Sequence, residues 1–147
     1  MIEVTEKDIS IDEVVSKTRR PEMGAIVQFL GTVRSITEGK RVKRLDFEAE
    51  VKLAVEELEK IRAETIRDFG VTDVSIVHRI GNLNVGENIV LIVVGATHRN
   101  QAFDGCRYAI EQLKSRALIW KKEHIEGDSY WVGDRQVERE ERTGQDD

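Results

Sequence analysis

The sequence predicts an α+β fold of ferredoxin-like type, with a β-α-β-β-α-β core and additional antiparallel strands (α/β-hammerhead type). Three observations support this prediction. Apolar residues recur at helical spacing over residues 51–69 and again over 102–117. Residues 88–96 form an almost wholly apolar stretch, which is typical of a strand buried on both faces. Segments rich in β-branched and aromatic residues lie before and after each helical pattern.

The first third of the chain predicts mainly strands. Residues 2–5 alternate in polarity and favour an edge strand, and residues 8–17 could hold a short helix. Pro21, the only proline, separates this opening from the rest. Residues 24–33 then predict a strand, and residues 35–39 a loop.

The middle of the chain predicts a strand, a long helix and two further strands. Residues 42–48 favour a strand, and Gly70 is a natural stop for the helix that covers 51–69. Residues 71–78 and 88–96 predict neighbouring antiparallel strands joined by a glycine-containing loop.

The last third predicts a helix and two short strands. Asn100 is a suitable N-cap for the helix that includes residues 102–117. Residues 119–123 and 130–132 favour strands. Residues 134–147 form a highly charged tail with few apolar residues, so we expect a single catalytic domain over residues 1–133 followed by this tail.

Composition limits the class of protein. The chain has 147 residues, of which 39% are hydrophobic and 35% charged, as in a globular protein in solution. No apolar run reaches the ~20 residues of a membrane helix, and the first residues do not resemble a signal peptide, so a cytoplasmic location is expected. A single cysteine excludes an internal disulfide.

The charge pattern indicates a small anionic ligand. A net charge of -5 argues against nucleic-acid binding, and an aromatic content of 5% argues against an RNA-binding sheet. Basic residues nevertheless concentrate in two segments, residues 34–44 and 98–124. Two basic segments in an acidic protein suggest a site for a small anion.

Lys114 and Lys121 are the first candidates for chemistry. Lys114 lies at the end of the predicted helix and Lys121 in the following strand, so both amines can face one pocket. A lysine beside other cations loses its proton more readily and can act as a general acid or base. The alternative is that Lys114 only stabilises the helix C-terminus and Lys121 is solvated.

Two other segments could bind an anion. His98 and Arg99 lie where a buried strand meets a helix N-terminus, where backbone N–H groups and the helix dipole favour phosphate. Thr32, Val33 and Arg34 end a strand that contains a glycine. In both cases an ordinary surface location remains the alternative.

Other kinds of site find little support. The three histidines lack metal-ligand spacing, and no segment has the sequence of a P-loop. Cys106 lies on the apolar face of its predicted helix and is assigned to the core. The chain therefore offers no reactive cysteine for chemistry.

Helix length suggests a site shared between two copies of the chain. Asn100 and Lys114 are separated by fourteen residues, about 21 Å along a helix. One chain cannot easily bring His98 and Lys114 to the same small ligand. If both belong to one site, a homodimer should supply them from different protomers.

An ordered set of short motifs resembles the catalytic (large) subunit of molybdopterin synthase, the MoaE-like family. The resemblance runs from about residue 24 to residue 131. The motifs are Phe29-Leu30-Gly31-Thr32-Val33-Arg34, Leu45-Asp46-Phe47-Glu48, His78-Arg79-Ile80-Gly81, Gly86-Glu87, His98-Arg99 with Ala102-Phe103, Leu113-Lys114 and Trp120-Lys121-Lys122-Glu123.

The resemblance implies a sulfurtransferase without a cofactor or catalytic metal. The family forms the dithiolene of molybdopterin from cyclic pyranopterin monophosphate, in the biosynthesis of molybdenum cofactor. Its sulfur comes from the C-terminal Gly-Gly thiocarboxylate of a small ubiquitin-like carrier. Two catalytic chains and two carriers form a heterotetramer.

The resemblance also implies roles for individual residues. Lys114 and Lys121 match the catalytic lysines, with Lys114 nearer the carrier terminus. The positions that match the substrate-binding site are Thr32, Val33, Arg34, His98, Arg99, Lys122 and Glu123. Two departures from the family pattern are Leu118, where a proline is common, and Ala49-Glu50, where a second aromatic residue is common.

The alternative function is a non-catalytic ferredoxin-like module that binds a phosphate-containing ligand. Such a module would need Arg34, His98 and Arg99, whereas Lys114 and Lys121 would be dispensable. The two hypotheses therefore differ in the effect of replacing the lysines.

Overall fold

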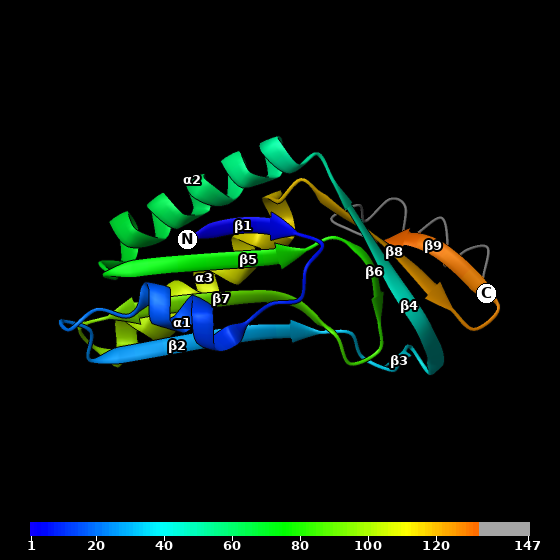
Figure 1. Ribbon diagram of the computed structural model, residues 1–147, viewed down its shortest axis with the longest axis horizontal. Helices are drawn as coiled ribbons and strands as arrows, with labels where there is room; N and C mark the ends of the chain where they lie inside the picture. The colour runs from blue at the N-terminus through cyan, green and yellow to red at the C-terminus, as the bar shows by residue number, and fades with distance from the viewer. Residues whose placement is uncertain (133–147) are drawn as a thin grey trace.

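Two β-sheets and three helices make up residues 1–132, the part of the chain that the computed structural model describes (Figure 1). The elements, in chain order, are β1 (Ile2–Thr5), α1 (Ile11–Thr18), β2 (Ala25–Thr32), β3 (Ile36–Thr37), β4 (Lys40–Ala49), α2 (Val51–Phe69), β5 (Asp73–Arg79), β6 (Gly81–Asn84), β7 (Asn88–Ala96), α3 (Arg99–Arg116), β8 (Ile119–Ile125) and β9 (Asp128–Val132). The predicted tail, 134–147, lies outside the described residues.

The first sheet has the strand order β1-β5-β7-β2 and is covered by helices on both faces (Figure 1). Strand β1 runs parallel to β5, and the other pairs are antiparallel. In β7, Val90, Ile92 and Val94 pack toward α2 and α3, whereas Leu91 and Val93 belong to the cluster around α1. This two-sided burial explains the apolar run that predicted the strand.

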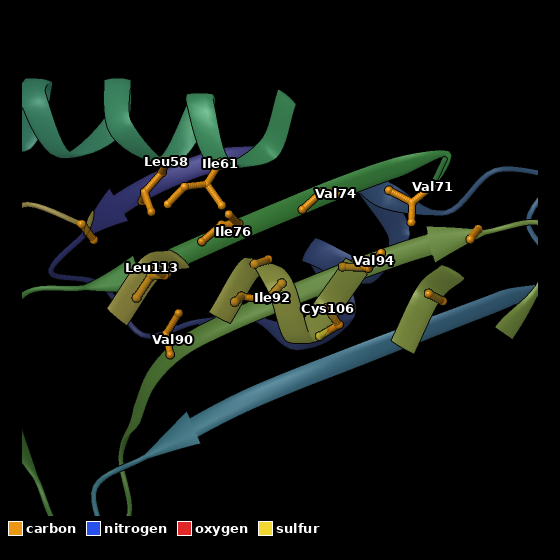
Figure 2. Packing of buried hydrophobic residues seen from close by; sticks show 14 residues of the cluster. Leu58, Ile61, Val71, Val74, Ile76, Val90, Ile92, Val94, Cys106 and Leu113 are labelled. Carbon is orange, nitrogen blue, oxygen red and sulfur yellow. The ribbon is translucent and has the colours of Figure 1, made fainter. Parts of the chain in front are cut away.

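The larger core lies between the first sheet and helices α2 and α3. Figure 2 shows Leu58 and Ile61 of α2 above the strand that contains Val74 and Ile76. Cys106 of α3 is in the same cluster, as expected for a core cysteine. Burial raises the pKa of the Cys106 thiol to about 11, so this sulfur stays protonated and unreactive near neutral pH.

The predicted helix over 51–69 is confirmed at both ends. The Glu50 side chain caps α2 by accepting a hydrogen bond from the Leu53 backbone N–H, at 2.8 Å. The helix ends at Gly70, whose φ of 64° lies in the left-handed region that glycine adopts without strain.

The predicted N-cap of α3 is wrong by two residues. The cap position is His98, not Asn100, and the helix begins at Arg99. The end of β7 sets the start of the helix. Because β7 continues to Ala96, the chain enters the helix at Arg99, before it reaches the Asn100 side chain that would cap a helix better. At its other end α3 stops at Ala117, whose backbone is extended, so no proline at Leu118 is needed to end the helix.

The second sheet has the order β3-β4-β8-β9, with β6 also paired to β4. Residues 81–87 were expected to be only a loop, but Gly81–Asn84 form a strand. Leu83 drives this pairing because it lies opposite Leu45 and is fully buried in a second apolar cluster. Gly81, with φ of 94°, permits the sharp turn that separates β6 from β5.

The predicted α+β class is confirmed, strands β3 and β6 form where loops were predicted, and the core strands are divided between the sheets. The predicted order β-α-β-β-α-β occurs as β4-α2-β5-β7-α3-β8, with the short strand β6 inserted between β5 and β7. Strands β5 and β7 lie in the first sheet, and β4 and β8 pair in the second. The end of α3 and the start of β8 therefore lie where the two sheets approach each other (Figure 1).

Within residues 1–132, none of the helices is long and apolar enough to span a membrane.

Candidate active site

A cavity of about 660 Å³ lies where the two sheets approach each other. Its walls come from strands β2, β3, β4, β5, β7, β8 and β9 and from the end of α3. Much of its surface is apolar and includes Phe29, Leu45, Phe47 and Ile89. The polar and charged lining residues are Thr32, Arg34, Thr37, His78, Glu111, Lys114, Ser115, Lys121 and Glu123. A cavity of this size and mixture suits a ring-containing anionic ligand.

Lys114 and Lys121 line this same cavity. Lys114 lies on the last turns of α3, and its side chain is exposed. Lys121 lies opposite Phe47 in the pairing of β8 with β4. Because side chains alternate along a strand, Lys121 and Glu123 face the cavity together.

The two lysines have different surroundings. The Lys121 Nζ lies 3.9 Å from the Glu123 Oε1, and Glu123 is buried, with 5% of its surface exposed. Lys114 forms no hydrogen bond or ion pair with another residue in the described range 1–132. One amine is thus held beside a buried carboxylate, and the other is available to an incoming anion.

The end of β2 and the two residues after it contribute two of the three residues predicted there to the cavity. Thr32 and Arg34 line it, and both side chains are exposed. Val33 points into the apolar cluster of the second sheet instead, with 2% exposure. Its backbone is held by the turn before β7, through the Val33 N–H to Glu87 carbonyl bond (3.0 Å) and the Gly86 N–H to Val33 carbonyl bond (2.8 Å).

The other three predicted residues do not line the cavity. His98 and Arg99 lie at the start of α3, whose 18 residues place them about 27 Å along the axis from its end. Lys122 is next to Lys121 but faces the opposite side of β8, where its Nζ lies 5.6 Å from the centre of the Trp131 ring.

Comparison with known proteins places the chain in a family. The model of the family described as MoaE protein matches residues 4–116. The molybdopterin synthase catalytic subunit of Pyrococcus abyssi is 40% identical over 132 residues, which are 89% of this chain and 89% of that protein.

The chain belongs to the MoaE family.

Solved structures agree with this assignment. Molybdopterin synthase from Staphylococcus aureus superposes with a TM-score of 0.84 at 37% identity, covering 88% of this chain and 95% of that chain. A complex of subunits 1 and 2 of molybdopterin-converting factor from Helicobacter pylori gives a TM-score of 0.70 at 22% identity over 91% of both chains, which shows a shared fold. These relatives confirm the predicted class of function, that of a molybdopterin synthase catalytic subunit, a sulfurtransferase of molybdenum cofactor biosynthesis.

In this MoaE chain the sequence reasoning missed His78 as a site residue. His78 is the second-last residue of the buried strand β5, lines the cavity and is 4% exposed. Its Nδ1 lies 2.6 Å from the Arg79 carbonyl oxygen, and its ring meets Phe47 edge to face at 5.3 Å between centroids. Two signals were available: the place of His78 in the motif His78-Arg79-Ile80-Gly81, and its position as a polar residue near the end of a buried strand. Thr37, Glu111 and Ser115 were also missed.

The His78 ring is neutral near neutral pH. The pKa of His78 is lowered from its ordinary value of 6.5 to about 4. Burial is the main cause, the bond to Arg79 opposes it, and the nearby positive charge of Lys114 adds to the lowering. No group of three His, Cys, Asp or Glu side chains that could hold a metal ion occurs within the described part of the chain.

The lowered pKa of His78 predicts a specific acid sensitivity of folding. Because the folded state disfavours the charged ring, its stabilising contribution is complete above pH 6.5 and is lost as the pH falls toward 4. We expect a loss of about 3 kcal/mol from this group over that interval. Denaturant unfolding of the wild type and of His78→Asn from pH 7 to pH 4 measures it. Parallel pH profiles for the two proteins would contradict this assignment.

Proposed function

We propose that the chain transfers sulfur from the C-terminal thiocarboxylate of a small ubiquitin-like carrier to cyclic pyranopterin monophosphate, which becomes molybdopterin. The observation that supports this reaction is the meeting of Lys114 and Lys121, from a helix and a strand, in one cavity with Arg34 and Thr32. The buried, protonated Cys106 cannot supply sulfur, so an external donor is required.

The reaction creates negative charge that fixed cations can stabilise. In each transfer a carbon–sulfur bond forms at a pterin carbon whose bond to oxygen breaks, and the displaced oxygen stays on the phosphate or leaves as water. The bond between sulfur and the carrier's acyl carbon also breaks. The acyl carbon then takes up water and becomes a carboxylate. Both steps pass through anionic species, which positively charged groups stabilise most strongly in a partly apolar cavity.

Residue roles follow from position in the cavity. We assign Lys114 the role of binding the carrier thiocarboxylate, because its amine has no competing partner among the described residues. Lys121 moves protons at the pterin and is held by Glu123. Thr32 and Arg34 bind the phosphate or ring, and Val33 positions both through its backbone bonds. Lys122 supports β8 from its opposite face.

His98 and Arg99 enter this proposal through a second copy of the chain. They lie at the far end of α3 from Lys114, so they can complete a site only in a partner protomer. We therefore propose a homodimer with composite sites, flanked by two carriers. The complex of subunits 1 and 2 of molybdopterin-converting factor from Helicobacter pylori supports the association with a second, different subunit, and the homodimer rests on the span of α3.

The deciding experiment is reconstitution from purified components. The chain is incubated with precursor and thiocarboxylated carrier, and dithiolene product is detected. Product should form with the thiocarboxylate and not with the same carrier ending in a carboxylate. Absence of product with both substrates present would favour the alternative, a phosphate-binding module without catalysis.

A further inference from the structure

The imidazole of His78 is a polar group in the cavity wall that the proposed reaction does not use. It is 4% exposed and is held from two sides, by the Arg79 carbonyl and by the edge-to-face contact with Phe47. A side chain held in this way has a fixed orientation, so the direction of each ring nitrogen is fixed as well.

The contact with Arg79 decides which nitrogen carries the proton. A carbonyl oxygen can only accept, so Nδ1 donates the hydrogen bond at 2.6 Å and the neutral ring has its lone pair on Nε2. No other described residue forms a hydrogen bond with this ring. His78 therefore offers one uncharged acceptor at the wall of a cavity whose other nitrogen groups are donors.

Lys114 is the cation best placed to use this acceptor. Its charge acts on the His78 ring, and both residues line the cavity. The other charged groups there are Lys121, which is beside Glu123, and Arg34 and Glu111, which are exposed. A carboxylate partner would neutralise Lys114, whereas a neutral acceptor orients the ammonium group and leaves its full charge for an anion.

We propose that His78 is a positioning residue for Lys114: when the carrier tail occupies the cavity, His78 Nε2 accepts a hydrogen bond from the Lys114 ammonium group and directs it at the thiocarboxylate. This inference rests on the proposed function. It adds to that function an uncharged group that orients the Lys114 ammonium group without neutralising its charge.

Two substitutions separate positioning from a purely structural role. His78→Asn keeps an N–H donor near the place of Nδ1 and loses the Nε2 acceptor, whereas His78→Gln keeps a neutral acceptor near Nε2 and loses the bond to Arg79. We expect kcat to fall about tenfold to a hundredfold in the Asn variant, with KM for the precursor nearly unchanged. The Gln variant should retain activity within about threefold of wild type. The opposite order, with Asn active and Gln impaired, would show that only the Arg79 bond matters and would overturn the proposal.

A measurement that needs neither turnover nor a changed histidine covers the case in which these variants do not fold. The ¹⁵N resonance of His78 Nε2 is recorded in the complex with carboxylate-form carrier, for wild type and Lys114→Met. Loss of the amine should shift this resonance toward that of an imidazole nitrogen without a donor. An unchanged resonance would refute the contact. Changes in the backbone amide spectrum show separately whether the carrier binds. Failure of wild-type turnover would count against the proposed function and not against the contact between His78 and Lys114.

Discussion

Replacement of Lys114 or Lys121 by alanine is expected to lower turnover with thiocarboxylated carrier by about 10²–10³-fold. Each substitution removes a cation from a partly apolar cavity in which anionic species form, and loss of one such group typically has an effect of this size. The cavity should otherwise remain, because both amines lie on its surface and not in the packed clusters. Single-turnover formation of dithiolene product measures the loss.

Lys122→Ala is the matched control for Lys121→Ala. The two residues are adjacent in β8, have the same side chain and face opposite sides of the sheet. We expect the control to keep most of its activity, since its amine lies over Trp131 and not in the cavity. Near-normal turnover in both cavity-lysine variants would refute the assigned roles and favour the non-catalytic module.

Mixing two inactive variants is expected to restore activity. If His98 and Lys114 of one site come from different protomers, a heterodimer of His98→Ala and Lys114→Ala chains contains one intact site and one doubly altered site. Random exchange makes half of the dimers mixed, so activity should rise from near background to roughly a quarter of wild type. The assay is turnover after the two chains are unfolded together and refolded.

The control for this experiment mixes variants of the same half-site. His98→Ala and Arg99→Ala lie side by side at the start of α3, so no combination of these chains creates an intact site. We expect no recovery in that mixture. Absence of recovery in the first mixture as well would contradict the composite site, while leaving the roles of the cavity lysines to be judged from the single variants.

Local patterns in the sequence predicted the helices and strands whose buried residues follow a regular pattern along the chain. Helix α2 was predictable from apolar residues at helical spacing and from Gly70 at its end. Strand β7 was predictable because both of its faces are covered. The proximity of Lys114 and Lys121 was also predictable. The end of α3 and the start of β8 are close in sequence, so one short connection limits the distance between the two lysines.

Contacts between distant segments decided the rest. The pairing of Leu83 with Leu45 made a strand of a predicted loop, and the burial of Val33 depends on the same cluster. Phe47 joins Lys121 across the second sheet and His78 from the first, although these three residues lie far apart in the chain. The pattern of residues within one segment does not predict contacts of this kind.

The sequence by itself thus determined the α+β class, the long helix, the buried strand and the basic residues available for chemistry. The tertiary structure alone decided which of those residues share a cavity, that His98 and Arg99 lie at the other end of α3 from Lys114, and that His78 is buried beside the site. The physical reason is that helix and strand patterns depend on neighbours along the chain, whereas cavity walls and buried polar groups depend on strand register and packing between distant segments.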